Sequence, residues 1–248
     1  MNQIIHEIGN HLKQANHIVI LTGAGVSTDS GIPDFRSAGG IWDTDQTREY
    51  YMSNHYYRNN PDDFWKKYKQ IFQLKLAGEY EPNEIHDFLK RLEVEGKHIS
   101  IITQNVDGLH TKAGSRHVLE YHGTLATASC PACGDTYPLT YVMNTDIPLC
   151  GHCSVPLKPD VVLFGDPITE HEKAEQMIEQ AEFMLVLGTS LWVKPFNLLP
   201  EFAVYECNIP AAIINREPTA KDNLFDFVVH SELKKAISKL QNDLFHNN

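Results

Sequence analysis

The sequence predicts an α/β fold in which helices cover both faces of a mostly parallel sheet, with a small module attached. Short apolar runs alternate with amphipathic helical stretches along the chain. Two glycines directly follow the first of these runs, and a segment with paired cysteines interrupts the alternation. Short strands that alternate with helices in this way are typical of a parallel sheet buried on both faces.

The helices and strands are predicted in chain order. Apolar residues at helical spacing predict the first helix, before Asn16: Ile4, Ile8, Leu12 and Ala15. The run "HIVILT" at 17–22 then predicts a buried strand that ends at the glycines. Further apolar runs predict the other strands of the sheet: 98–103, 160–164, 183–188, 211–215 and 226–230. Amphipathic stretches predict two of the covering helices: 83–95 and 169–181.

The segment 39–77 breaks this rhythm. It is rich in Tyr and Asn, and "NNPDD" predicts that it forms one helix, with Asn60 as N-cap and Pro61 in the first turn. The cysteine segment interrupts the alternation a second time. We therefore expect one large domain with a smaller appendage.

Composition limits the possible functions. The chain of 248 residues has a formal net charge of −11, and no apolar run approaches the length that spans a membrane. Its first residues lack the basic segment, apolar core and cleavage site of a secretion signal, so a cytoplasmic location is predicted. The acidic charge argues against strong nucleic-acid binding, which depends on Lys and Arg. It favours basic partners such as lysine-bearing peptides.

Four of the five cysteines form two CxxC pairs, Cys130 with Cys133 and Cys150 with Cys153. Four thiolates at this spacing can close a tetrahedron around one structural zinc ion and leave no open coordination position. A redox pair or disulfides are the weaker alternatives. His152 is a possible competing ligand.

The turn after the first predicted strand reads "GAGVSTDSGIPDFRS". Thr28 stands where a dehydrogenase fingerprint needs a small residue, which argues against hydride transfer. The sequence instead predicts a helix of little more than one turn, which begins at Ser27 and ends at Gly31. Free amides at such a helix could hold a pyrophosphate. The chain then turns back and brings three residues to the nucleotide: Asp34, Phe35 and Arg36.

Seven motifs occur in the order found in sirtuins, the NAD-dependent protein lysine deacylases: "GAGVSTDSGIPDFR", "TQNVDGLH", "YHGT", the CxxC pairs, "VVLFGD", "GTSLWVKP" and "INREPT". The resemblance implies transfer of the acyl group from acyl-lysine to the ADP-ribose of NAD, with release of nicotinamide. It also implies three modules. The expected ranges are a Rossmann-like NAD-binding domain at 1–38, 79–125 and 158–248, a helical module with a cofactor-binding loop at 39–78, and a zinc-ribbon module at 126–157.

The resemblance assigns catalysis to His122 and Asn105. His122, in "YHGT", matches the family's base, which takes a proton from a ribose hydroxyl, and an imidazole titrates in the right range. Asn105 and Asp107 fit the nicotinamide pocket, and Gln104 fits the ribose hydroxyls. An Asx turn at the start of the following helix is an alternative role for "NVDG". His110 is predicted to be structural.

The remaining NAD contacts come from three segments. Arg36 is expected to meet a phosphate, Phe35 to shield the reactive ribose face, and Asn215 to reach the adenosine ribose. Without the resemblance, the segments after these strands would be interpreted as ordinary turns from a strand into a loop. The residues assigned to NAD by resemblance, besides those above, are Gly23, Ala24, Gly25, Ile32, Asp34, Val106, Gly188, Thr189 and Ser190.

The substrate peptide is expected to add as a strand between "PDVVLFGD" and "SLWV". The residues assigned to it are Val161, Val162, Phe164, Gly165 and Val193. An ordinary core strand is the alternative for 160–164. Two positions depart from the family pattern, since many sirtuins have Glu at Asp166 and usually Leu at Tyr121.

The acyl preference can be predicted from one helix. Sirtuins that prefer succinyl- or malonyl-lysine carry a Tyr and, three residues later, an Arg, because an acidic acyl group needs a cation. Here Tyr68 is present, but Ile71 stands in the Arg position. Lys69 is expected to point elsewhere on the helix. Acetyl and other neutral acyl groups on lysine are therefore the predicted substrates.

Two other functions stay open at this point. A zinc-ribbon interaction or nucleic-acid module would explain only the cysteine segment, and the acidic charge opposes it. ADP-ribosyl transfer to protein, or NAD hydrolysis, would use the same NAD site. His122 argues only partly against these reactions, because the base acts mainly after nicotinamide has left.

Overall fold

A computed structural model of the chain describes residues 1–33, 47–72 and 80–245. Its main feature is a six-stranded sheet with the order β3-β2-β1-β7-β8-β9, in which all neighbouring strands run parallel. The strand order reverses between β1 and β7, because β2 and β3 follow on one side of β1 and β8 and β9 follow on the other side of β7. The carboxyl ends of the strands at such a point form a crevice for ligands. The strands are β1 (His17–Thr22), β2 (His98–Thr103), β3 (His117–Glu120), β7 (Phe183–Leu187), β8 (Ala211–Asn215) and β9 (Phe227–His230).

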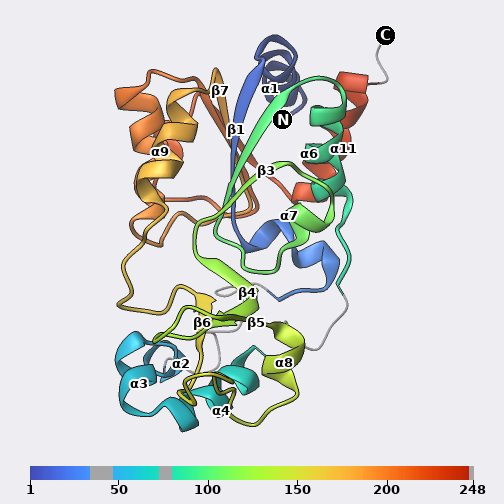
Figure 1. Cartoon of the computed structure of the whole chain (residues 1–248). Helices are drawn as coiled ribbons and strands as arrows, with labels where there is room; N and C mark the ends of the chain where they lie inside the picture. Colours follow the sequence, from blue (N-terminus) through green and yellow to red (C-terminus); the bar gives the residue numbers. More distant parts are fainter. Residues whose placement is uncertain (34–46, 73–79, 246–248) are drawn as a thin grey trace.

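Helices cover both faces of this sheet (Figure 1). One face packs against α1 (Asn2–Gln14), α6 (Glu84–Val94) and α11 (Leu233–Phe245). The other face packs against α9 (His171–Glu179) and the helical segment from 196 to 206, which includes α10 (Leu199–Glu201). The short helix α7 (Leu109–Lys112) follows β2. Because strands β1 and β7 are buried on both faces, every residue of β7 and the four central residues of β1 are apolar.

A smaller part of the molecule lies beyond the carboxyl ends of these strands (Figure 1). It contains a three-stranded antiparallel sheet of order β5-β4-β6, and its own core includes the buried aromatic residues Phe64, Trp65 and Tyr68. Trp65 Nε1 donates to Leu157 O at 2.8 Å, which ties α4 to this sheet. The elements are β4 (Gly123–Ser129), β5 (Thr136–Pro138), β6 (Lys158–Val161), α2 (Thr47–Tyr51), α3 (Asn54–Asn59), α4 (Pro61–Ile71) and α8 (Leu139–Met143).

The predicted fold class is confirmed, and several elements differ from the prediction. The run at 160–164 is not a strand of the parallel sheet, because β6 pairs antiparallel with β4. The segment expected to form one helix contains three, α2 to α4, among its described residues. The predicted helix from Ser27 is instead a pair of 3₁₀ turns, Ala24–Val26 and Thr28–Ser30, which end at Gly31 with φ of 85°. Strand β3 was not predicted. The proposed module boundaries stay a prediction.

Candidate functional site

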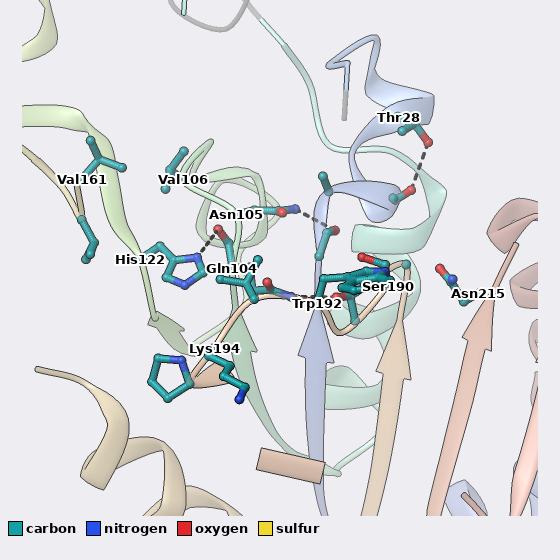
Figure 2. A pocket seen from close by; sticks show the side chains of 18 of the residues that line it. Thr28, Gln104, Asn105, Val106, His122, Val161, Ser190, Trp192, Lys194 and Asn215 are labelled. Carbon is teal, nitrogen blue, oxygen red and sulfur yellow. Dashed lines mark hydrogen bonds between the residues drawn. The ribbon is translucent and has the colours of Figure 1, made fainter. Parts of the chain in front are cut away.

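A cavity of about 1070 Å³ opens at the carboxyl ends of the parallel strands and extends to the smaller part of the molecule. Segments that follow β1, β2, β7 and β8 line one end of it, and residues after β6 line the other (Figure 2). This is the place where open parallel sheets bind dinucleotides, and the volume is that of a site for a large ligand.

Glycines allow two strand-end turns to approach closely. A Cβ on Gly25 would lie 2.9 Å from Gly188 Cα, and one on Gly188, whose φ is +60°, would lie 2.9 Å from Val26 N. Gly25 N donates to Gly188 O at 3.0 Å. Among the described residues, the backbone amides of Gly23, Gly25, Val26 and Ser27 are bonded internally, whereas those of Ala24, Thr28 and Asp29 have no acceptor. These last three residues line the cavity, so their amides are available to a pyrophosphate.

Two polar side chains after β2 face the same end of the cavity. Asn105 is buried, and its Nδ2 donates to Gly23 O and Ser27 Oγ, both at 3.1 Å. Gln104 Nε2 donates to Thr189 Oγ1 at 2.8 Å. These bonds join the turns after β1, β2 and β7 and fix polar groups at the cavity wall, as a site for a ribose and a carboxamide requires.

Asp107 is used differently. Its Oδ1 accepts from Leu109 N at 3.0 Å, and its Oδ2 accepts from Ser27 Oγ at 2.8 Å. The alternative Asx turn is thus present at the start of α7. Asp107 does not line the large cavity, so its contact with nicotinamide stays a prediction.

A buried polar network under this wall supports Asn105. Thr103 Oγ1 accepts from Thr22 Oγ1 at 2.8 Å and from Asn105 N at 3.0 Å. His110 Nε2 lies 3.0 Å from Thr22 Oγ1, so the ring is assigned as the donor. His86 packs against His110 with ring centroids 4.8 Å apart. The prediction that His110 is structural agrees with its burial.

This network should make stability sensitive to acid. Burial, and secondarily the charge of His86, lowers the pKa of His110 to about 3. In the unfolded chain this histidine has an ordinary pKa near 6.5. Between about pH 6.5 and about pH 3, His110 is therefore protonated in the unfolded chain but neutral in the folded one. Neutral His110 contributes fully to the free energy of unfolding above this pH window. Within the window, the free energy of unfolding falls by up to about 1.4 kcal/mol for each pH unit.

Urea unfolding at pH 7.5 and pH 5.0 tests this expectation. The loss of unfolding free energy between the two pH values should be smaller in His110→Gln than in the wild type. Only the difference between pH values is compared, because the substitution itself costs stability. Equal losses in both proteins would contradict the assignment.

His122 lies in the turn between β3 and β4, at the junction of the two ends of the cavity (Figure 2). The following residue, Gly123, has φ of +73°, and a Cβ there would lie 1.9 Å from Asp160 O. Only glycine fits so close to β6. Val162 N donates to His122 O at 2.8 Å, which attaches the histidine backbone to the segment after β6.

The imidazole of His122 is set up as a neutral base. Nδ1 lies 3.3 Å from the carbonyl oxygen of Gln104, an acceptor only, so Nδ1 carries the hydrogen and Nε2 keeps a free lone pair. Burial lowers the pKa of His122, and the Gln104 carbonyl partly opposes this shift. A histidine that is neutral near pH 7 can accept a proton.

The other end of the cavity is attached to the helical segments. Phe164 N donates to Met52 O and Phe164 O accepts from Asn54 N, both at 3.0 Å. Asp166 Oδ2 accepts from Lys158 Nζ at 2.6 Å and from Leu163 N at 3.0 Å. The backbone of Phe164 is therefore already paired, and an added peptide strand would have to use neighbouring groups such as those of Gly165.

Most of the predicted site residues meet at this cavity. Ile32 and Asp107 do not line it, and Asp34, Phe35 and Arg36 lie outside the described residues. The predicted residues that line it are Gly23, Ala24, Gly25, Gln104, Asn105, Val106, His122, Val161, Val162, Phe164, Gly165, Gly188, Thr189, Ser190, Val193 and Asn215.

Several residues that line the cavity were not predicted from the sequence. Met52 and Phe72 come from the helical segment, and no motif marks them. Trp192 lines the cavity with 69% of its surface exposed. It lies inside the quoted "GTSLWVKP", so an unusual aromatic residue within that motif was a signal that could have identified it.

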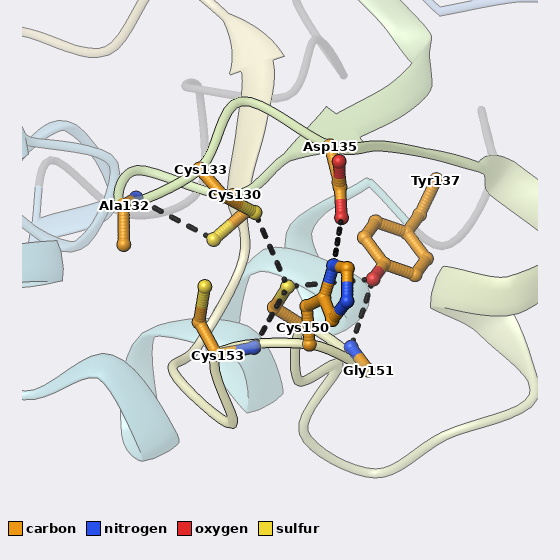
Figure 3. A network of polar contacts seen from close by, with 9 residues as sticks. Cys130, Ala132, Cys133, Asp135, Tyr137, Cys150, Gly151 and Cys153 are labelled. Atoms are coloured by element: carbon orange, nitrogen blue, oxygen red, sulfur yellow. Dashed lines mark hydrogen bonds and ion pairs between the residues drawn. The ribbon is translucent and has the colours of Figure 1, made fainter.

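The four paired cysteines form one cluster, in which all four Sγ atoms lie within 4.8 Å of one another (Figure 3). Cys133 Sγ and Cys150 Sγ are 3.7 Å apart, close to the roughly 3.8 Å expected for a tetrahedral ion with Zn–S bonds of about 2.3 Å. His152 instead faces Asp135, with Nδ1 3.4 Å from Oδ2.

Donors around the sulfurs suit thiolates. Ala132 N donates to Cys130 Sγ, and Cys153 N and Tyr137 Oη donate to Cys150 Sγ, each at 3.4 Å (Figure 3). Hydrogen bonds to metal-bound sulfur orient the ligands and spread their charge. The cluster is able to bind one structural zinc ion, and it offers four thiolates with no need of water as a ligand.

Comparison with known proteins gives a consistent result. The model of the Sir2 family matches residues 23–195. An NAD-dependent protein deacetylase of Bacillus subtilis is 49% identical over 229 residues, which cover 90% of this chain and 93% of the relative. An NAD-dependent protein deacetylase of Chromobacterium violaceum is 48% identical over 227 residues, covering 92% of this chain and 93% of the relative.

Solved structures are also similar. A structure that describes the mechanism and regulation of Sir2 enzymes has a TM-score of 0.88, with 32% identity and full coverage of both chains. A Sir2 structure with a deacetylated p53 peptide and 3′-O-acetyl-ADP-ribose has a TM-score of 0.87 and 29% identity. It covers 96% of this chain and 98% of that chain.

Proposed function

Because the chain belongs to the Sir2 family and is an NAD-dependent protein deacetylase, we propose that it removes acetyl and other neutral acyl groups from lysine, with His122 as the base. The observation that carries this proposal is the placement of His122. Its free Nε2 is available in the cavity between the turns assigned to NAD and the segment assigned to the peptide.

Each end of the cavity has a separate task in this reaction. With NAD bound as the second substrate, its ribose carbon would bond to the acyl oxygen as the bond to nicotinamide breaks. A ribose hydroxyl would then bond to the acyl carbon, and one water would be consumed as the free lysine leaves. Asn105 and Gln104 hold the polar groups of the ligand, and His122 then takes a proton from a ribose hydroxyl at Nε2. Phe164 and Val161, at the apolar end, line the space for the acyl group of the lysine.

The neutral acyl preference rests on the side chains at the peptide end. Apart from His122 and the turns assigned to NAD, the lining residues between 52 and 164 are all apolar. They are Met52, Phe72, Val161, Val162, Leu163 and Phe164. Tyr68 and Ile71 pack in the core of the smaller part, and neither lines the cavity, so the helix pair does not itself bear on the acyl preference. Lys69 Nζ donates to the carbonyl oxygens of Thr145 and Asp146, so it points to the zinc ribbon.

An acyl panel tests this preference. Acetyl, propionyl and succinyl peptides of one sequence should be turned over with succinyl slowest, because the lining residues between 52 and 164 at this end carry no Lys or Arg. Met52→Arg would place a guanidinium in this lining and should raise the succinyl-to-acetyl ratio of kcat/KM by about 10- to 100-fold, the gain of a charge-assisted hydrogen bond.

Met52→Leu is the matched control, since it keeps an apolar side chain of similar volume. It should leave the ratio unchanged. A wild-type protein that removes succinyl as fast as acetyl would contradict the neutral preference. It would leave the deacetylase activity standing.

The partner class follows from the same cavity. Sir2 structures with a p53 peptide support a peptide substrate for this chain, and the net charge of −11 favours basic protein segments over nucleic acid. Within the described residues, no helix could cross a bilayer. A cytoplasmic location stays a prediction.

A further inference from the structure

Tyr121, directly before His122, carries a hydroxyl that the proposed function does not use. Its side chain is fully buried, and its Oη lies 2.6 Å from His171 Nδ1. This is also a position where the sequence departs from the sirtuin pattern, which usually has Leu. A leucine would fill apolar space but could not make this hydrogen bond, so the hydroxyl has a role that packing alone does not explain.

His171 connects Tyr121 to a second element. It is the first residue of α9 and lines the cavity. Its Nε2 lies 3.5 Å from Glu175 Oε1, one turn further along the same helix. The carboxylate favours a hydrogen on Nε2, which leaves Nδ1 to accept from the tyrosine hydroxyl. The start of α9 is thereby bonded to the turn that carries His122.

The orientation of the His122 ring depends on an aromatic wall formed by Tyr121 and Phe196. The rings of Tyr121 and His122 meet edge-on with centroids 5.3 Å apart, and Phe196 packs against Tyr121 at 5.2 Å. Among the described residues, the imidazole itself makes one hydrogen bond, the 3.3 Å contact with Gln104 O. One long bond leaves the ring free to tilt, so its aromatic neighbours limit the tilt.

We propose that Tyr121 and His171 are positioning residues for His122, because their hydrogen bond holds the aromatic wall against which the imidazole packs. This inference rests on the proposed role of His122 as the base. The base acts after nicotinamide has left. Loosening the wall should therefore slow acyl transfer and leave the earlier step unchanged.

The two steps can be measured on one protein. Incorporation of labelled nicotinamide into NAD, with an acetyl-lysine peptide present, reports the reversal of the first step. Formation of acetyl-ADP-ribose reports the later step. Tyr121→Phe keeps the ring and removes the hydroxyl, so it should lower transfer about five- to tenfold, the equivalent of one hydrogen bond. Exchange and the KM for NAD should stay within about twofold, since no group that contacts NAD is changed.

Variants of His171 provide the control. His171→Ala should change the ratio of transfer to exchange as Tyr121→Phe does, and the double variant should be no worse than either single one. His171→Gln, whose amide oxygen can accept from Tyr121, should restore part of the transfer rate. Melting temperatures identify any variant that is simply less folded.

The ratio decides the outcome. A parallel fall of both rates in Tyr121→Phe, an unchanged transfer rate, or additive effects in the double variant would overturn the inference. A wild-type protein that exchanges nicotinamide but transfers no acetyl group would contradict the proposed function itself. The two failures are therefore distinguishable.

Discussion

Replacement of His122 by Ala is expected to lower acetyl transfer to ADP-ribose by about 10²- to 10⁴-fold, the usual contribution of a general base. Among the described residues, His171 also lines the cavity, but its Nδ1 lies 2.6 Å from the Tyr121 hydroxyl and its Nε2 faces Glu175, so it has no free nitrogen to act as the base. Exchange of labelled nicotinamide should persist, because the first step needs no base. The measurement is product formation by mass spectrometry beside nicotinamide exchange.

His55→Ala is the matched control, since His55 is an exposed histidine on α3 that does not line the cavity. It should leave both rates unchanged. If His122→Ala transferred acetyl at more than about a tenth of the wild-type rate, this would be well above the residual activity expected without a general base. Another group would then have to be the base.

Loss of the zinc site is expected to have the largest effect on structure. Cys130 and Cys150 are buried in the core of the smaller part, together with Val161 and Leu163 near the peptide end of the cavity. Structural zinc contributes on the order of 10 kcal/mol to the folding of small zinc modules. Cys150→Ser should therefore lose bound zinc, unfold the ribbon and abolish deacetylation.

Cys207→Ser provides the comparison, because Cys207 lies outside the cysteine cluster and only partly packs on the large domain. It should keep one zinc per chain and normal activity. Zinc content is measured by elemental analysis, and folding by thermal unfolding with and without a chelator. A fully active Cys150→Ser protein without metal would refute the structural role of the cluster.

Local patterns were sufficient to predict five of the six strands of the parallel sheet, all but β3. The apolar runs that become β1, β2, β7 and β8 are buried on both faces, so their composition alone identifies them, and the run of the partly exposed edge strand β9 is apolar as well. The cysteine spacing identified the metal cluster, because four thiolates need no long-range information to be recognised. The resemblance identified His122, and the structure explains its glycine by the close approach of Asp160 O to Gly123.

The features that could not be predicted from the sequence depend on contacts between residues far apart in the chain. The run at 160–164 is as apolar as a parallel strand, yet its segment pairs antiparallel with β4, and only the tertiary partner distinguishes the two. Met52 reaches the cavity because the backbone around it is bonded to Phe164, far away in the chain. The contact between Tyr121 and His171 spans fifty residues and has no local signature.

The most direct test of the account is mass spectrometry of the products formed from NAD and an acetyl-lysine peptide. Each peptide that is deacetylated should yield one nicotinamide and one acetyl-ADP-ribose, and omission of NAD should stop the reaction. If NAD is consumed while the peptide stays acetylated, or if ADP-ribose becomes attached to protein, the cavity binds NAD but the acyl group of lysine is not its substrate.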